Sequence, residues 1–201
     1  KRRGKSGAPK TKIDFVKKIY SDVNKYKIIV IGSGPGGSIS SFRLAQAGHE
    51  VLLMEEGGSY KVSDRYDTQE MTEKYKNSGM TMTFGRPLIN YAEGNCVGGG
   101  SEINSGLYHR IPEEILSKWE NKNNLSFDRE ELYKSYKDIE DNLNISYMPD
   151  SLIPRASSII SEGCEKLGWA CSEIPRWYSY DDDGNGTKQS MTETYIPKFI
   201  N

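Results

Sequence analysis

The chain reads KIIVIGSGPGGSISSFRLAQAGHEVLLMEEGG from Lys27 to Gly58, and this stretch decides the fold. The apolar, β-branched run Ile28–Ile31 has the composition of a buried parallel strand, and a glycine-rich loop follows it directly. Apolar residues at helical spacing come next and stop at Gly48, before a second apolar run, Val51–Met54, that ends at Glu55. This order predicts a β-α-β unit, in which the helix connects two parallel strands.

The loop after the first strand carries the spacing Gly32-x-Gly34-x-x-Gly37, which is typical of dinucleotide binding when it stands between a strand and a helix. The first glycine permits the tight turn, the second lets the backbone approach a pyrophosphate, and the third lets helix and strand pack closely. The free N–H groups of the helix N-terminus face the anion. Glu55 ends the second strand, where a carboxylate accepts hydrogen bonds from a ribose 2′-hydroxyl and repels a 2′-phosphate. The unit therefore predicts a site for FAD or NAD rather than NADP.

The composition of the whole chain is that of a globular protein. Its 201 residues are 35% hydrophobic and 27% charged, the net charge is −1, and no apolar run is long enough to span a bilayer. We expect no transmembrane segment and a cytoplasmic location by default, although sequons at Asn124, Asn144 and Asn185 are compatible with secretion. Two visible parallel strands are too few for a doubly wound sheet, so we expect the chain to be part of a longer polypeptide.

Charge is unevenly distributed along the chain. Residues 1–27 hold ten Lys or Arg and two Asp, which gives this segment a charge of about +8 and the remainder about −9. A basic arm is able to bind nucleic acid or an anionic membrane surface, but no aromatic interleaving or recognition motif accompanies the charge. We therefore favour a basic leader or severed segment over 1–26, with a short amphipathic helix around Ile13–Tyr20 that packs on the next domain. No nucleic-acid partner is predicted.

Neither the cysteines nor the acidic residues predict a metal site. Cys96, Cys164 and Cys171 form no CxxC pair, and their odd number argues against a disulfide framework. The segment Asp181–Gly186 resembles the start of a calcium-binding loop, but Thr192 stands where such a loop needs a bidentate glutamate. We predict an Asp/Asn/Gly turn between extended segments instead.

Two later helices are predicted from apolar residues at helical spacing. One runs from an N-cap at Asp128 to Leu143, with Glu131 at the third helical position, and the other covers Ala156–Leu167 and ends at Gly168. We interpret their apolar stripes as packing faces, and their carboxylates, which alternate with lysines, as solvated.

A second glycine-rich loop, GNCVGGGSEINSGLYHR, lies between Gly94 and Arg110. A backbone so free of side chains is able to lie flat against a large planar ligand or its phosphates, and Ser101 and Asn104 supply directional hydrogen bonds. An NAD enzyme does not need a second loop, whereas FAD is long enough to occupy both. The loop therefore favours FAD and argues against an NAD-binding reductase domain.

The second loop also carries a family resemblance. The pattern Val97-Gly98-Gly99-Gly100-Ser101-x-Ile103-Asn104-x-Gly106-x-Tyr108 resembles the signature of the glucose-methanol-choline (GMC) family of FAD-dependent oxidoreductases. The N-terminal unit shares the resemblance, and the helix from Asp128, Lys166–Trp169 and Thr187–Ser190 are more loosely similar to the long-chain alcohol and sterol oxidase branches. The resemblance implies an α/β fold: a Rossmann-like FAD-binding domain with helical additions over 27–201, incomplete, with the start of a substrate domain near its C-terminus.

The resemblance assigns cofactor contacts residue by residue. Some family members attach FAD covalently through a histidine where this chain has Ile103, so non-covalent FAD is implied. Ile111 departs from the signature, which has a small residue or proline there, and Pro112 follows it, so the end of the match stays open. The implied contacts are Gly32, Gly34, Pro35, Gly36, Gly37 and Glu55 for the adenosine diphosphate part, and Gly99, Gly100, Asn104, Gly106 and Leu107, together with Val97 and Ser101, for the isoalloxazine end.

The resemblance also implies the reaction, in which a histidine takes the hydroxyl proton of an alcohol and hydride passes to flavin N5. This chain has only His49, in the turn before the second strand, and His109, which we interpret as structural or solvated. A catalytic histidine is thus expected beyond residue 201, and the chain alone is expected to be inactive without the remaining polypeptide or a complementing chain. The predicted function is FAD-dependent oxidation of the CH–OH group of a small-molecule alcohol. The alternative is a non-catalytic flavin- or nucleotide-binding fragment of a truncated or split gene.

Overall fold

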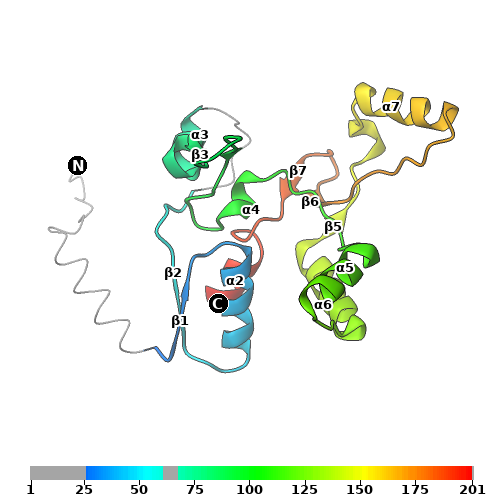
Figure 1. The fold of residues 1–201 in the computed structure, drawn as a ribbon. Coiled ribbons are helices and arrows are strands. Elements are labelled where there is room, and N and C mark those ends of the chain that lie inside the picture. Colours follow the sequence, from blue (N-terminus) through cyan, green and yellow to red (C-terminus); the bar gives the residue numbers. More distant parts are fainter. Residues whose placement is uncertain (1–25, 61–67, 201) are drawn as a thin grey trace, which may run out of the picture.

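The computed structural model describes residues 26–60 and 68–200 of the chain. Within these ranges the architecture is mixed α/β, with one parallel strand pair, two small antiparallel sheets and helices around them (Figure 1). No helix of these ranges has the length and apolar character that a membrane crossing requires. The basic segment 1–26, including the helix predicted around Ile13–Tyr20, falls almost wholly outside the described residues. The division into a leader and a domain stays a prediction.

The N-terminal β-α-β unit has the boundaries that the sequence predicts. Strands β1 (Ile28–Ile31) and β2 (Val51–Met54) pair in parallel, with Ile28 opposite Val51. Helix α2 (Pro35–Gln46) connects them and begins with a proline. An N–H at the first helical position would have no acceptor within the helix, so the helix loses no hydrogen bond because proline lacks this group. Gly48 ends the helix with φ +87°, a conformation that glycine adopts without steric cost. Strand, glycine turn, helix and strand are therefore confirmed.

The predicted burial of β1 is wrong for the described residues. Its side chains alternate, and Ile29 and Ile31 face away from α2 with 40% and 86% of their surface exposed. A parallel strand is buried only when elements cover both faces of its sheet. Among the described elements, α2 covers one face.

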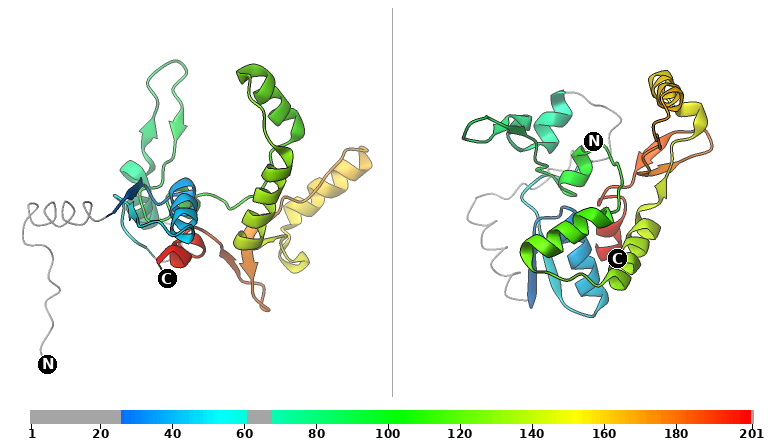
Figure 2. Two further views of the ribbon diagram at one scale, coloured as in Figure 1. Left: turned by 90° about the horizontal axis from the view of Figure 1, so that it is seen from below. Right: turned by 45° about the vertical axis from the view of Figure 1, so that its right-hand side comes forward.

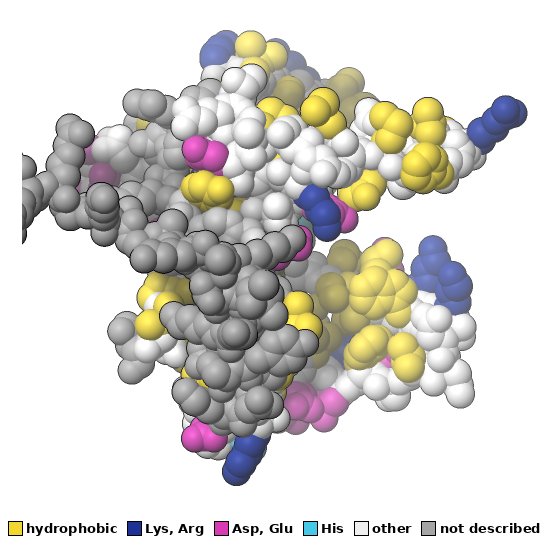
Figure 3. Space-filling model, turned by 90° about the vertical axis from the view of Figure 1, so that its left-hand side faces the viewer, with side chains coloured by type: hydrophobic (Ala, Val, Ile, Leu, Met, Phe, Trp, Pro, Cys, Tyr) yellow, Lys and Arg dark blue, Asp and Glu magenta, His cyan; other side chains and the backbone are white. Residues whose placement is uncertain are grey.

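A β-hairpin that the sequence did not predict follows the first unit. Helix α3 (Thr68–Lys74) and the short turn η1 (Lys76–Gly79) lead into β3 (Thr81–Met82) and β4 (Asn90–Tyr91), which pair antiparallel. The hairpin projects from the rest of the chain (Figure 2). Figure 3 shows apolar side chains gathered along it, and the large exposed ones are Met80, Met82, Phe84, Leu88, Ile89 and Tyr91.

The middle of the chain is helical. Helix α4 (Gly100–Ile103) forms one turn inside the second glycine loop, and α5 (Glu113–Asn123) and α6 (Arg129–Leu143) follow. The carboxylate of Asp128 accepts a hydrogen bond from the backbone N–H of Glu131 at 3.1 Å, so the predicted N-cap is confirmed.

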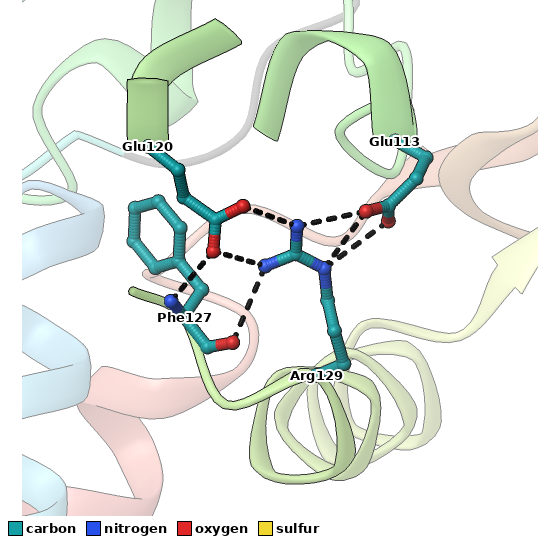
Figure 4. A network of polar contacts seen from close by, with 4 residues as sticks. All are labelled: Glu113, Glu120, Phe127 and Arg129. Carbon is teal, nitrogen blue, oxygen red and sulfur yellow. Dashed lines mark hydrogen bonds and ion pairs between the residues drawn. The ribbon is translucent and has the colours of Figure 1, made fainter. Parts of the chain in front are cut away.

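The guanidinium group of Arg129 joins α5 to α6 (Figure 4). It donates to Glu113 at 2.7 Å and to Glu120 at 2.8 Å, both on α5, and to the carbonyl oxygen of Phe127 at 3.3 Å. Glu120 also accepts from the backbone N–H of Phe127. One planar cation thus contacts α5 and the turn that leads into α6.

The C-terminal third contains a three-stranded antiparallel sheet in the order β5-β6-β7. The turn between the second and third strands is the predicted Asp/Asn/Gly turn, because the Asp181 carboxylate accepts from the backbone N–H of Asn185 at 2.7 Å and Gly184 takes φ +83°. The elements in order are β5 (Ile145–Ser146), η2 (Asp150–Leu152), α7 (Arg155–Lys166), β6 (Arg176–Tyr180), β7 (Gly186–Lys188) and α8 (Tyr195–Ile200).

The apolar core lies where α2, α6 and α8 meet. Leu143 of α6 packs with Met191 and with Tyr195 and Ile196 of α8, and all four are buried. The partly buried residues against this cluster come from α2, the second loop, α6, β5 and β6: Ile39, Phe42, Val97, Ile139, Ile145 and Trp177. Leu143 and Ile139 confirm the predicted packing face of α6, and Val97 ties the second glycine loop to the core.

The predicted packing face of α7 is wrong for the described residues. The helix forms at the predicted place, but Ile159 and Ile160 are 53% and 63% exposed, and Trp169 just beyond it is also exposed. Figure 1 shows why, because α7 stands apart from the other described elements. Helical periodicity predicts an apolar face and does not specify what covers it.

Candidate functional site

The first glycine loop turns back sharply at the carboxyl end of β1. Gly32 has φ +90° and its N–H donates to the carbonyl oxygen of Met54 at 2.7 Å. A Cβ atom on Gly37 would lie 1.8 Å from the carbonyl oxygen of Gly32, so only glycine fits there. Gly34 is the N-cap of α2 and has no side chain to cap it, which leaves the first N–H groups of a twelve-residue helix to an outside acceptor.

Glu55, at the end of β2, is bound to this loop. Its Oε2 accepts from the backbone N–H of Ser33 at 2.8 Å and from the Ser33 hydroxyl at 2.7 Å, and its Oε1 accepts from the N–H of Gly57 at 2.9 Å. Burial raises the pKa of this carboxyl group, but the hydrogen bonds from Ser33 and Gly57 lower it more, so the net pKa lies below its ordinary value. A carboxylate that stays ionised is therefore fixed beside the first loop.

The second glycine loop lies directly against the first. A Cβ on Gly99 would come within 2.8 Å of the Gly34 Cα, and Gly98 donates its N–H to the Ser33 hydroxyl at 3.0 Å. Gly98 and Gly99 have φ +92° and +55°. Two loops that are 65 residues apart in sequence thus meet backbone to backbone, and Figure 1 shows α4 near the N-terminal end of α2.

The end of the second loop is held by other elements. Gly106, with φ +66°, packs against the indole of Trp177 on β6, and its carbonyl oxygen accepts a hydrogen bond from the backbone N–H of Trp177 at 2.9 Å. The Asn104 side chain accepts from the N–H of Gly106 at 3.1 Å, and Leu107 is 48% exposed. The amide oxygen of Asn104, predicted to contact a ligand, therefore already has a partner in the protein.

Ser101 is likewise used inside the protein. Its hydroxyl is fully buried, donates to the carbonyl oxygen of Gly98 at 2.7 Å and accepts from the N–H of Met191 at 3.0 Å. The structure thus gives this side chain a role in shaping the loop, and a direct contact with cofactor stays a prediction.

The structure brings together most of the predicted residues. The first loop, Glu55 and Gly99 form one constellation, while Asn104, Gly106 and Leu107 belong to a part of the loop that contacts β6 and β7. Within the predicted set, Pro35 and Gly36 form the first turn of α2, Gly100 begins α4, and Val97 packs on the core.

Sequence reasoning missed Ser33, which links all three parts of the constellation. It is 2% exposed and bonds both Glu55 and Gly98. The fingerprint leaves this position open to any residue, so the available signal was only a small hydroxyl side chain between two glycines. Asn95 was missed as well, and its buried amide oxygen has no hydrogen-bond partner among the described residues.

The structure gives no catalytic or metal-binding role to the histidines and cysteines of the described residues. His49 and His109 are both exposed. Cys96 is buried, and desolvation raises the pKa of its thiol to about 11, which keeps it protonated. Within the described ranges, no group of three or more His, Cys, Asp or Glu side chains is placed to hold a metal ion.

Comparison with known proteins supports the family resemblance. Residues 71–199 match the model of the GMC oxidoreductase family. The chain is 37% identical over 182 residues to an uncharacterised GMC-type oxidoreductase of Sinorhizobium fredii, covering 85% of this chain and 36% of that protein. It is 30% identical over 200 residues to a long-chain-alcohol oxidase of Arabidopsis thaliana, covering 93% of this chain and 26% of that protein.

A shorter match of 35% identity over 97 residues, 45% of this chain and 17% of the relative, is to a cholesterol oxidase of Acinetobacter baumannii. The chain therefore spans about a third or less of the length of these curated relatives. The resemblance inferred from the second loop is confirmed.

Proposed function

The chain belongs to the GMC oxidoreductase family, whose N-terminal domain binds FAD in a Rossmann-type fold, and we propose that it is the FAD-binding part of an enzyme that oxidises the CH–OH group of an alcohol. The observation that carries this proposal is the joining of two glycine loops and one ionised carboxylate through Ser33. A single dinucleotide loop would suffice for NAD, whereas an FAD molecule is long enough to follow both.

The residues fit FAD in three respects. The Gly34–Gly99 approach brings the two loops together where a Cβ on Gly99 would push them apart, and the N-terminus of α2 has no side-chain cap among the described residues, which leaves its N–H groups to an anion. The amide oxygen of Asn95, next to Gly94 in the second loop, is buried and has no hydrogen-bond partner among the described residues, and we assign a donor on the cofactor to it. We assign Gly32, Gly34, Pro35, Gly36, Gly37 and Glu55 to the adenosine diphosphate part, and Val97, Gly99, Gly100, Ser101, Asn104, Gly106 and Leu107 to the isoalloxazine end.

Each part of the chain has a separate task in the proposed chemistry. When bound, FAD supplies the hydride acceptor. The α2 N-terminus binds the pyrophosphate, Glu55 orients the ribose, and the second loop positions the ring. We place the acceptor of the hydroxyl proton in sequence beyond residue 201, because His49 and His109 are exposed and neither belongs to the constellation.

For the substrate we propose an alcohol with a large hydrocarbon body. Support comes from two relatives, which are named for oxidising long-chain alcohols and cholesterol. Such molecules present one hydroxyl group to the site and apolar surface to the rest of the enzyme.

The decisive experiment is an FAD titration of the parent, Glu55→Ala and Glu56→Ala, followed by flavin fluorescence. Glu56 is the matched control, because it is the neighbouring carboxylate, is 74% exposed and, among the described residues, forms an ion pair with Lys76 at 3.8 Å. We expect Glu55→Ala to weaken binding by about 1.5–3 kcal/mol, the range of a hydrogen bond to a charged group, and Glu56→Ala to bind as the parent does. A parent that takes up no FAD would refute the proposed function. Equal affinity of all three would remove Glu55 from the site.

We also propose that FAD is held without a covalent bond, since Ile103 stands at the position where some family members use a histidine. Acid precipitation of the loaded protein is expected to leave yellow flavin in the supernatant. Flavin that stays in the pellet and survives proteolysis on a peptide would contradict this. Anaerobic addition of fatty alcohols, sterols and sugars to the full-length holoenzyme then identifies the substrate class by bleaching of the flavin.

A further inference from the structure

The second loop is held from one side by residues 188–192, a segment that begins at the end of β7. The N–H of Met191 donates to the Ser101 hydroxyl at 3.0 Å, and the Thr192 hydroxyl donates to the Glu102 carboxylate at 2.8 Å. Lys188 contacts two main-chain carbonyl groups of the loop. Its ammonium group donates to the carbonyl oxygen of Glu102 at 2.6 Å and to that of Asn104 at 2.9 Å.

Lys188 occupies the C-terminal end of α4. Carbonyl groups at the end of a helix have no intrahelical donor and need a partner from elsewhere. The Lys188 ammonium supplies two charge-assisted hydrogen bonds there, on either side of Ile103. The path of the main chain from Glu102 to Asn104 is therefore set by one side chain that lies 84 to 86 residues later in sequence.

This arrangement places the Glu102 carboxyl group and the Lys188 ammonium group in partly buried surroundings. The Glu102 residue is only 7% exposed. Desolvation lowers the pKa of Lys188, and the negative charge of Glu102 opposes that shift. Apolar packing generally stabilises a fold at least as well as buried charges do, whereas buried charges specify one arrangement of their neighbours. The cluster is accordingly better suited to fixing geometry than to adding stability.

Resting on the proposed function, we propose that Lys188 is a positioning residue for the flavin end of the site, which holds the Glu102 and Asn104 carbonyls in the arrangement that receives the isoalloxazine ring. Asn104 is then fixed from both sides, since its side chain binds the Gly106 N–H while its carbonyl binds Lys188. Loss of the ammonium group frees this stretch without removing any atom assigned to cofactor contact.

The test compares Lys188→Met, Lys188→Arg and the control Lys137→Met, which removes a lysine that is 76% exposed on α6. Amide hydrogen exchange of the cofactor-free proteins reports the order of residues 98–106. Titration with FAD and the visible absorption spectrum of the bound flavin report the site. We expect faster loop exchange, FAD binding weakened about tenfold or more and shifted flavin bands in Lys188→Met, with much of each effect restored in Lys188→Arg and none present in Lys137→Met.

The outcomes separate this proposal from the proposed function. Unchanged loop exchange in Lys188→Met, or parental affinity and spectrum, would overturn the positioning role. Faster exchange in Lys188→Met together with a parent that binds no FAD would leave the loop contact standing and refute the proposed function. If Lys188→Met does not fold, Thr192→Val serves as the second variant, because it removes the hydroxyl donor to Glu102 and keeps all charges; parental exchange and affinity in that variant would count against the proposal.

Discussion

The two glycine loops and the α5–α6 pair are held together in different ways. In the loops, bare backbone meets bare backbone, and a serine that is 2% exposed supplies the hydrogen bonds. In the helix pair, the Arg129 guanidinium reaches Glu113 and Glu120 at the surface, where the Glu113 side chain is 56% exposed. At Gly37 and Gly99 the loops therefore have no room for a side chain, whereas long charged side chains at a surface can move and be replaced by water.

This difference predicts where the protein is sensitive to substitution. Adding a single carbon atom at Gly37 or Gly99 forces the backbone to shift, because interiors are close-packed and backbone atoms cannot rotate aside. Removing a whole charged group from the helix pair leaves its partners solvated. Four substitutions or pairs of substitutions test this ordering, from the largest expected effect to the smallest.

The largest effect is expected for Gly37→Ala. The new Cβ would lie 1.8 Å from the Gly32 carbonyl oxygen, so the loop must move, and overpacking of this kind costs about 1–3 kcal/mol or more. Thermal unfolding and FAD titration are the measurements, and we expect loss of both stability and cofactor binding. Gly163→Ala is the control, because its Cβ meets nothing within 4 Å on α7 and alanine favours a helix by about 0.5–1 kcal/mol. Parental affinity in Gly37→Ala would show that the loop is more adaptable than the structure indicates.

The second effect concerns Ser33→Ala, which leaves the Gly98 N–H without its acceptor and removes one donor to Glu55. An unsatisfied buried group costs about 1–3 kcal/mol, measured by urea unfolding of the cofactor-free protein. Ser40→Ala, on the exposed face of α2, should unfold as the parent does. A double-mutant cycle with Glu55→Gln is expected to be non-additive, because the two side chains share a hydrogen bond. Additive losses would mean that Ser33 and Glu55 act separately.

The same contrast explains how far the sequence predicted the structure. The β-α-β unit, the Asp128 cap and the Asp181 turn depend on neighbours within a few residues, so local spacing indicates them. The Gly34–Gly99 contact joins residues with no side chains, and nothing in either loop signals the other. Lys188 is one of 27 basic residues, and its position became informative only once the fold brought it to the second loop. The strands of the projecting hairpin have two residues each, too few for alternation to be visible.

A smaller effect is expected where the end of the second loop meets α6. Arg110 binds the Glu140 carboxylate through two nitrogens, at 2.5 and 2.6 Å, and the Tyr108 hydroxyl donates to it at 2.7 Å. These contacts, led by that of Arg110, lower the pKa of Glu140 from 4.5 to about 2. A lowered pKa means that the folded state gains stability above pH 4.5 and loses it as the pH falls toward 2.

Glu140→Gln is therefore expected to flatten the dependence of unfolding on pH between those two values. Glu130→Gln, an exposed carboxylate on the same helix, should leave it unchanged. At alkaline pH the relevant group is the Tyr108 hydroxyl, whose pKa is raised from 10.0 to about 12 by burial and by the neighbouring Glu140 carboxylate. Tyr108 therefore stabilises the folded state fully below pH 10, and this stabilisation is lost as the pH rises through 12. Parent and Glu140→Gln curves that run parallel in acid would contradict the assignment.

The smallest effect is expected for Arg129→Gln, although this substitution removes more hydrogen bonds than any of the others. The Glu113 carboxylate, the Glu120 carboxylate and the Phe127 carbonyl all lose a donor. Water is able to reach both carboxylates and replace the lost hydrogen bonds. Exposed ion pairs add little to the free energy of unfolding, because desolvation and the loss of side-chain entropy offset their attraction. We expect a slight fall in the unfolding temperature that shrinks further at high salt, because screening already weakens the pairs in the parent. FAD affinity should match that of the parent. Lys137→Gln, which removes a charge held only at 3.9 Å from Asp141 on the same helix, is the control for charge alone. A fall in unfolding temperature that is independent of salt and as large as that of Gly37→Ala would contradict this ordering. It would mean that the α5–α6 pair tolerates substitution no better than the glycine loops do, although its side chains are more exposed.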